Sequence, residues 1–196
     1  MADLNAALIG LLGLMAGGYV NNFLAEDYRR FRDGQALAGA LAGELESHAE
    51  AFDFIKRGLE NMIPVAADKG LDLTEWPIPP SPLFDENAAK IGLLGPQSAR
   101  DVAYVYENIR AFRQNFHMLS KDHRKMPKEW GPAMIGGCLA AIQRAETRGR
   151  PLIETLKSHA AEEYRNRPET RDQVRFALKF GAAAVFVLFV LSRIFG

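Results

Sequence analysis

The sequence is poor in cysteine and carries no net charge, and each scarcity excludes a class of protein. The single cysteine, Cys138, cannot form an intramolecular disulfide. It lies in the segment GGCLAAI, which predicts a small buried side chain rather than a nucleophile or a metal ligand. Lys plus Arg and Asp plus Glu both number 24, so the formal net charge is zero and nucleic acid is not predicted as a partner.

Repeats, low-complexity tracts and glycine-rich phosphate loops are also missing, and runs that alternate apolar and polar residues are short and few. With 196 residues, 48% of them hydrophobic, the chain has room for one domain of ordinary size and short membrane segments. We therefore expect an all-α protein: an antiparallel bundle of about four helices, flanked by N- and C-terminal transmembrane helices.

Charged side chains are absent from residue 4 to residue 25. A helix of about 20 apolar residues matches a hydrocarbon layer of about 30 Å, so residues 4–25 are predicted to form an N-terminal transmembrane helix. The alternative is a secretory signal peptide. The opening Met1-Ala2-Asp3 lacks the positive charge of such a peptide, and Gly17-Gly18-Tyr19 is a poor cleavage site, so a permanent anchor is favoured.

A second apolar segment, residues 176–195, is predicted to form a C-terminal transmembrane helix. Its uninterrupted apolar part, residues 180–191, is short for a span. The long side chains of Lys179 and Arg193 extend it, because their charged ends reach the lipid headgroups. The alternative for both ends is a buried helical hairpin of a soluble protein.

Small residues on these segments predict close helix packing. Gly10, Gly13 and Gly17 lie three and four positions apart, and Gly181 with the following alanines is a suitable counterpart. The pairing joins either the two ends of one chain or two copies of the chain. Basic residues predict the orientation, since they gather on the inner flanks of both segments and place residues 26–170 in the cytoplasm. They are Arg29, Arg30, Arg32, Arg165, Arg167, Arg171, Arg175 and Lys179.

The middle of the chain, residues 26–170, is predicted to be the helical bundle. Apolar stripes with helical spacing run over residues 37–62, ending before Pro64, and over residues 102–119, 134–142 and 152–160. The break at Gly149-Arg150-Pro151 separates the last two. A short helix over residues 85–91 is expected to end at Gly92 in a left-handed conformation.

Residues 71–83 are predicted to be a connector, because their prolines remove hydrogen-bond donors and force extended or turn geometry. We expect an ordered loop with Trp76 packed on the bundle. The alternative is a proline-rich segment that docks on the aromatic groove of a partner domain.

The run Phe84-Asp85-Glu86-Asn87-Ala88-Ala89-Lys90-Ile91-Gly92-Leu93-Leu94, followed by Val102 and residues 104–106, resembles a motif of small uncharacterised bacterial membrane proteins that also begin with a hydrophobic segment. The resemblance covers about a quarter of the chain. It implies a bacterial, membrane-bound protein, hence an inner-membrane location, and it implies no activity and no site residues.

The densest basic cluster lies between two predicted helices and consists of Lys121, His123, Arg124, Lys125, Lys128 and the aromatic Trp130. Each Lys or Arg beside anionic lipid contributes about 1 kcal/mol, and Trp suits the membrane interface, so the cluster is predicted to contact lipid headgroups. The alternative is a solvated turn without a ligand.

Two pairs of titratable residues share predicted helix faces: Glu44 with His48, and His159 with Glu163. Carboxylates and imidazoles placed in this way hold metals in some helical bundles, but the usual Glu-x-x-His spacing is absent. Surface ion pairs, or a hydrogen-bonded core histidine, are the favoured interpretation. No metal and no cofactor are predicted.

The leading hypothesis is a non-enzymatic, membrane-anchored accessory or scaffold protein that acts by association with lipid and with a protein partner or a second copy. One alternative is a membrane-bound sensor or effector with a ligand site in the bundle, where binding would shift helix packing. A second alternative is a metalloenzyme built on Glu44, His48, His159 and Glu163.

Overall fold

The computed structural model describes residues 10, 13–14, 17–18 and 20–195. All of its regular structure is helical within these residues, which confirms the all-α prediction. The chain divides into two compact units: a bundle unit, Gly34–Ala160, and a terminal unit formed by Met1–Asp33 and Ala161–Gly196. The predicted bundle, residues 26–170, thus extends beyond the bundle unit at both ends of the sequence range.

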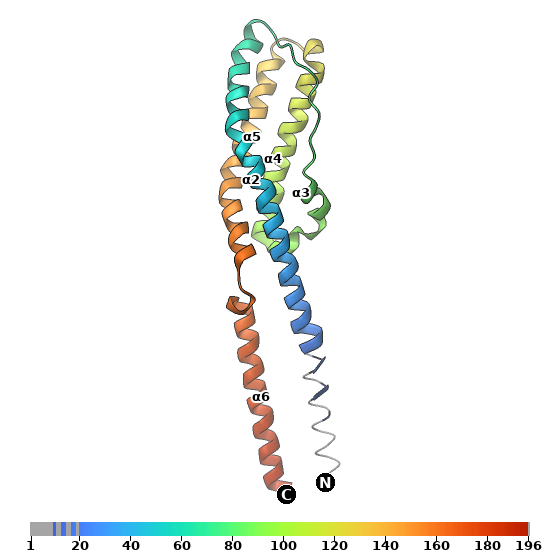
Figure 1. Cartoon of the computed structure of the whole chain (residues 1–196), viewed down its shortest axis with the longest axis vertical. Coiled ribbons are helices and arrows are strands. Elements are labelled where there is room, and N and C mark those ends of the chain that lie inside the picture. The colour runs from blue at the N-terminus through green and yellow to red at the C-terminus, as the bar shows by residue number, and fades with distance from the viewer. Residues whose placement is uncertain (1–9, 11–12, 15–16, 19, 196) are drawn as a thin grey trace. The chain divides into compact units, whose positions relative to one another are not determined.

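Three long helices build the bundle unit, and the chain order is α2 (Ala25–Asp68), α3 (Pro82–Asn87), the 3-10 helix η2 (Ala88–Leu94), α4 (Pro96–Asp122), the 3-10 helix η3 (His123–Lys125) and α5 (Trp130–Ala161). Figure 1 shows α2 and α4 running in one direction and α5 in the other. Residues 70–81 form no helix and return along the bundle as an extended segment. The predicted helices over residues 134–142 and 152–160 form one helix, α5, so the bundle has three long helices.

The predicted apolar stripes form the core of the bundle. Two clusters fill it, and they are centred on Leu41, Val105 and Leu156 at one end and on Leu119, Ile135 and Cys138 at the other. All six side chains are fully buried. The prediction of a buried Cys138 is confirmed, and burial raises the pKa of its thiol to about 11.

Two predicted breaks are wrong, because both helices continue through a proline. Helix α2 contains Pro64 and ends at Asp68, and α5 contains Pro151 and ends at Ala161. A proline inside a helix removes one hydrogen bond and costs about 3 kcal/mol. Burial of Ala66 after the first proline, and of Leu152, Ile153 and Leu156 after the second, favours continuation.

The short helix after the connector also ends elsewhere than predicted. Helix α3 is followed by η2, and the residue with positive φ is Gly95, at 81°, rather than Gly92. With ψ at 162°, Gly95 occupies backbone space that is open almost only to glycine. The turn before α4 therefore depends on Gly95.

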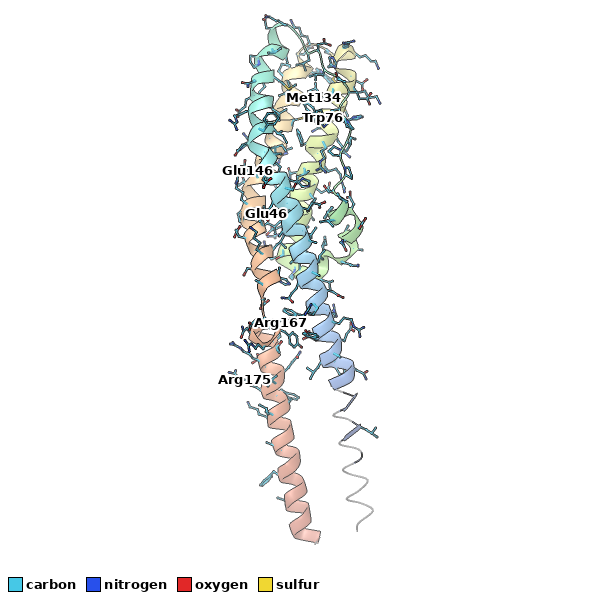
Figure 2. All side chains as sticks on the ribbon, viewed as in Figure 1. Glu46, Trp76, Met134, Glu146, Arg167 and Arg175 are labelled. Atoms are coloured by element: carbon cyan, nitrogen blue, oxygen red, sulfur yellow. The ribbon has the colours of Figure 1, made fainter. Side chains whose placement is uncertain are left out.

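The terminal unit comprises the π-helix η1 (Val20–Leu24), the beginning of α2, the 3-10 helix η4 (Tyr164–Asn166) and α6 (Pro168–Phe195). The Tyr164 hydroxyl donates a hydrogen bond to Asp27 Oδ2 at 2.8 Å, and the ring of Tyr164 lies 5.3 Å from that of Phe31. Arg167, labelled in Figure 2, lies over the Phe31 ring at 5.1 Å. These contacts join the two segments of the unit.

The two predicted transmembrane helices are not supported by the described residues, among which no helix is both long and apolar enough to cross a membrane. Most of the N-terminal segment, residues 4–25, lies outside the described residues. The C-terminal segment belongs to α6, whose earlier part carries Arg171, Asp172, Arg175 and Lys179.

Candidate functional site

A buried carboxylate organises the polar part of the bundle unit. Helix α3 begins with Pro82 after Ser81, whose side chain makes no capping hydrogen bond. Glu44 of α2 replaces that cap: its Oε1 accepts the Leu83 N–H at 3.1 Å and its Oε2 accepts the Phe84 N–H at 3.1 Å. The first N–H groups of a helix lack intrahelical partners, so Glu44 satisfies two of them and fixes α3 on α2.

Tyr106 of α4 completes this arrangement. Its hydroxyl donates to Glu44 Oε2 at 2.7 Å, and its ring stacks on Phe84 with centroids 4.0 Å apart. Burial, and the hydrogen bond to Glu44, hold the pKa of Tyr106 well above its usual value, so the hydroxyl stays protonated. One carboxylate thereby joins α2, α3 and α4.

Arg113 lies one turn after Ile109 on α4, and its side chain is half-buried beside this cluster. Its Nη1 donates to Ser81 Oγ at 2.7 Å, and its Nη2 lies 3.4 Å from His48 Nε2. Burial and the nearby Arg113 lower the pKa of His48, against an opposing effect of Glu44. His48 is therefore neutral at pH 7 and accepts the guanidinium N–H through Nε2.

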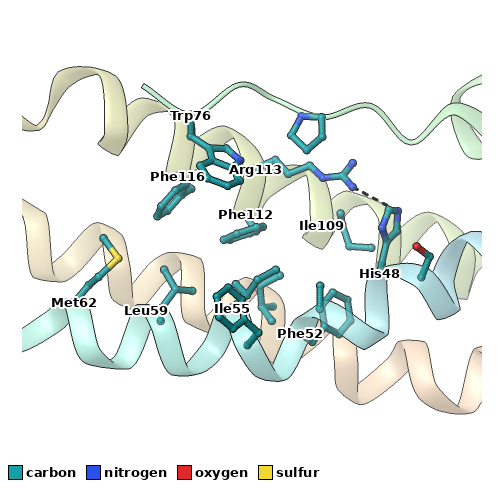
Figure 3. A pocket seen from close by; sticks show the side chains of 16 residues that line it. His48, Phe52, Ile55, Leu59, Met62, Trp76, Ile109, Phe112, Arg113 and Phe116 are labelled. Carbon is teal, nitrogen blue, oxygen red and sulfur yellow. Dashed lines mark hydrogen bonds between the residues drawn. The ribbon is translucent and has the colours of Figure 1, made fainter. Parts of the chain in front are cut away.

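An apolar groove of about 340 Å³ opens beside Arg113. Figure 3 shows one wall formed by α2 and the other by α4, with Trp76 of the connector above Phe116. Trp76 is half-exposed at the rim and meets Phe116 edge to face, with centroids 6.1 Å apart. The apolar walls consist of Phe52, Ile55, Leu59, Met62, Phe112 and Phe116.

Hydrogen bonds with α4 and η3 hold the connector over this groove. The Trp76 N–H donates to Ser120 Oγ at 2.9 Å, and His117 Nδ1 donates to the Trp76 carbonyl at 2.6 Å. The Leu73 N–H donates to His123 Nε2 at 3.3 Å. The expected ordered loop with Trp76 on the bundle is thus present, and its position shapes the groove.

Ser81 and His48 of the polar cluster do not form the close pair of an activated nucleophile and its base. Ser81 Oγ lies 3.5 Å from His48 Nε2, beyond the separation of an activated nucleophile and its base. Ser81 is buried, and the lowered pKa of His48 makes it a weaker base. Arg113 lines the groove, and its guanidinium carries five N–H groups.

The structure does not bring the four candidate metal ligands together. Glu44 and His48 are engaged by Tyr106 and Arg113, as described above. His159 lies beside Gly34 of α2, with its Nε2 3.5 Å from a Cβ built on that glycine. Gly34 is ten residues before Glu44, which is about 15 Å along the helix, so His159 is far from Glu44. Glu163 belongs to the terminal unit and accepts from Arg165 Nε at 2.7 Å. No group of three potential ligands among the described residues is placed to hold a metal ion.

The predicted lipid-contact cluster lies at the end of the bundle unit where α4 passes into α5, and most of its charges have partners. Trp130 is half-exposed beside them. The partners are Glu75 for Lys121 at 3.5 Å, Asp72 for Arg124 at 2.6 Å, Asp122 for Lys125 at 3.1 Å, and the Asp68 carbonyl for Lys128 at 2.7 Å. Headgroup contact stays a prediction, and the cluster has a structural role in holding the connector.

The predicted packing glycines, Gly10, Gly13, Gly17 and Gly181, are open: no described atom lies within 4 Å of a Cβ built on any of them. Close approach of another helix is therefore not seen among the described residues, and pairing between copies stays a prediction. Close approaches occur instead inside the bundle, where Gly39 faces Ala160 and Gly149 faces Val105.

The sequence analysis did not single out Arg113 as a candidate site residue. A signal was present, because Arg113 comes four residues after Ile109 and three before Phe116 and so shares their face. The role of Glu44 as a cap was also missed. Its partners Leu83 and Phe84 are about 40 residues away in the sequence, and no local pattern links them.

Comparisons of this chain with protein-family models, with curated proteins and with solved structures find no match. The resemblance of residues 84–94 to bacterial membrane proteins thus remains an observation on the sequence.

Proposed function

We propose that this chain is a membrane-attached, non-enzymatic helical protein that acts by association, with its bundle in the cytoplasm. The observation that carries the proposal is apolar exposure on α6. Phe176, Leu178 and Phe186 are 64%, 68% and 67% exposed. Exposed apolar area costs about 25 cal/mol per Å² in water, so these side chains favour an apolar environment.

The sequence around these residues supports a lipid environment and an orientation. Residues 180–191 contain no charged side chain, and Arg171, Arg175 and Lys179 precede them. Basic residues beside a membrane segment tend to stay in the cytoplasm, and this supports the proposed cytoplasmic location of the bundle unit. The membrane we propose is the bacterial inner membrane.

Membrane attachment is tested by fractionating cells that express the full-length chain. We expect the chain to pellet on ultracentrifugation, to resist extraction by high salt, and to dissolve in detergent. The double variant Leu178→Lys/Phe186→Lys should shift it toward the supernatant, whereas Met118→Lys, on an exposed position of α4, should not. A parent protein that stays in the supernatant without detergent would refute the proposal.

Association is proposed to involve either a protein partner or a second copy through Gly10, Gly13 and Gly17, whose surroundings are open among the described residues. Crosslinking in membranes should yield a discrete adduct. Gly13→Ile should abolish it, because a branched side chain prevents backbone approach, while Gly136→Ile on α5 serves as the matched control. A monomer without any co-purifying protein would contradict this part of the proposal.

A second candidate function is ligand sensing, and the groove beside Arg113 favours it. Its volume of about 340 Å³ falls within the range of small-molecule sites, and its polar groups lie at one end. A ligand between α2 and α4 would bias the packing of two elements that the Glu44 cluster joins.

A further inference from the structure

The groove of the bundle unit has an apolar body and one cationic end. We propose that it binds an anionic single-chain amphiphile, a long-chain fatty carboxylate, with the carboxylate on Arg113 and the acyl chain along the aromatic wall of α4. This proposal deepens the ligand-sensing candidate: it rests on the groove being a ligand site and adds the chemical class of the ligand.

The first support is the state of the Arg113 guanidinium. Its two hydrogen bonds go to Ser81 Oγ and His48 Nε2, both uncharged acceptors. No ion pair to Arg113 occurs among the described residues. Glu44 is the acidic residue with the largest electrostatic effect on Arg113. The oxygens of Glu44 already accept hydrogen bonds from Leu83, Phe84 and Tyr106.

Those bonds leave donors available for a ligand. A guanidinium carries five N–H groups in a planar fork, which matches the two oxygens of a carboxylate. His48 is uncharged at pH 7 because burial and Arg113 lower its pKa, so it does not compete as a second cation. Charge complementarity therefore selects a monoanionic head group over a neutral one.

The second support is the length and lining of the groove. It follows α2 from His48 to Met62, which is about 21 Å of helix at 1.5 Å per residue. Figure 3 shows aliphatic and aromatic side chains along this path and the Arg113–His48 contact at one end only. A flexible acyl chain fits such a path, and each buried methylene adds to binding.

The test uses the full-length chain in a fluorinated surfactant, which does not compete for a hydrocarbon site. The chain has two tryptophans, so Trp130→Phe leaves Trp76 at the groove rim as the single reporter. We expect dibromostearate to quench Trp76 saturably. In a Trp76→Phe variant the remaining Trp130, which does not line the groove, should show little quenching.

Ligand and residue controls separate charge recognition from apolar binding. The neutral dibromostearyl alcohol should bind at least about tenfold more weakly than the carboxylate, the loss of one charge-assisted hydrogen bond. Arg113→Gln should reduce carboxylate affinity by about the same factor and leave alcohol affinity unchanged. Arg110→Gln removes the same charge from the same helix, where Arg110 pairs with Glu107 and Asp85, and should change neither.

Each outcome decides the proposal. Equal affinity for acid and alcohol overturns the ligand class but leaves the groove as a ligand site. Absence of quenching by both ligands overturns the ligand-sensing function as well. Should Arg113→Gln fail to fold by circular dichroism, the acid-over-alcohol preference of the parent protein decides alone. Quenching that appears only after a dimer dissociates would assign the groove to a second copy and overturn the proposal.

Discussion

Glu44 is the residue on which the arrangement of α2, α3 and α4 depends, because one carboxylate receives two backbone N–H groups and the Tyr106 hydroxyl. Glu44→Gln keeps the shape of the side chain but replaces one carboxylate oxygen by an NH₂ group. That NH₂ group would face the N–H or O–H donors that Glu44 now accepts. We expect a loss of about 2–4 kcal/mol in the free energy of unfolding, measured by urea denaturation. Tyr106→Phe removes one of the three bonds and should cost about 1 kcal/mol. Equal stability of Glu44→Gln and the parent would contradict this role.

His48 should make the stability of the bundle pH-dependent. Its pKa is lowered from 6.5 by burial and by Arg113 of α4, with Glu44 of its own helix opposing. Below pH 6.5 the unfolded chain therefore binds protons more readily than the folded chain, so stability falls as the pH falls from 7.5 toward 5.5.

The matched variant is His48→Gln, which keeps a polar side chain and does not titrate. Its urea midpoint should change less than that of the parent over the same pH interval. A parent midpoint that rises on acidification would show that the Glu44 charge outweighs burial and Arg113 at this position.

At the scale of elements, two glycines of α2 make opposite predictions. Gly43 has no neighbour within 4 Å of a built Cβ, so Gly43→Ala should stabilise the bundle by up to about 1 kcal/mol through helix propensity. At Gly34 the built Cβ lies 3.2 Å from the Leu93 carbonyl oxygen and 3.5 Å from His159. Gly34→Ala should therefore lower the melting temperature, since crowding offsets the gain in propensity. Thermal melts of both variants decide, and a stabilised Gly34→Ala would refute the close approach of α2 and η2.

A second prediction for elements concerns the ion pair that joins α2 to α5. Glu146, labelled in Figure 2, accepts from Lys56 Nζ at 2.5 Å and from Arg150, and these hydrogen bonds lower its pKa. Both partners are shielded, with side chains 21% and 15% exposed for Lys56 and Glu146. Glu146→Gln should cost about 1–2 kcal/mol at pH 7.

The difference between Glu146→Gln and the parent should fade with acid. A depressed carboxyl pKa contributes stability above its unfolded value of 4.5, and that contribution is lost as the pH falls through the folded value. Urea midpoints at pH 7 and pH 3 measure this. Glu154→Gln, on the exposed face of α5, is the control and should have little effect at either pH.

The long helices could be predicted from the sequence because their apolar residues recur with helical spacing, as Leu37, Leu41 and Leu45 do on α2. The predicted breaks at Pro64 and Pro151 were wrong because the burial of apolar residues on both sides of each proline outweighs the cost of a proline inside the helix. The site was largely unpredictable. Arg113 shares a helix face with Ile109 and Phe116, but its contact with Ser81 joins segments 32 residues apart in the sequence, and no periodic pattern reveals a contact of that kind.

For the whole molecule, the division of the chain into two units implies separate stability. Both hydrophobic clusters lie within Gly34–Ala160, and so do the Glu44 network and the Lys56–Glu146 pair. The bundle unit thus contains its own core and its own polar contacts, which are the requirements for independent folding.

We therefore expect a protein consisting of residues 34–160 to be helical and to melt cooperatively, because every element that packs on its core is retained. With Trp130→Phe in this segment, circular dichroism and the fluorescence of Trp76 should follow one transition, since Trp76 packs on Phe116 of the same unit. The variant Leu41→Ala in this segment should lower the free energy of unfolding by about 2–5 kcal/mol, as expected for a fully buried leucine. A broad transition, or different midpoints for the two signals, would contradict this prediction. It would mean that the bundle unit needs the terminal unit in order to fold.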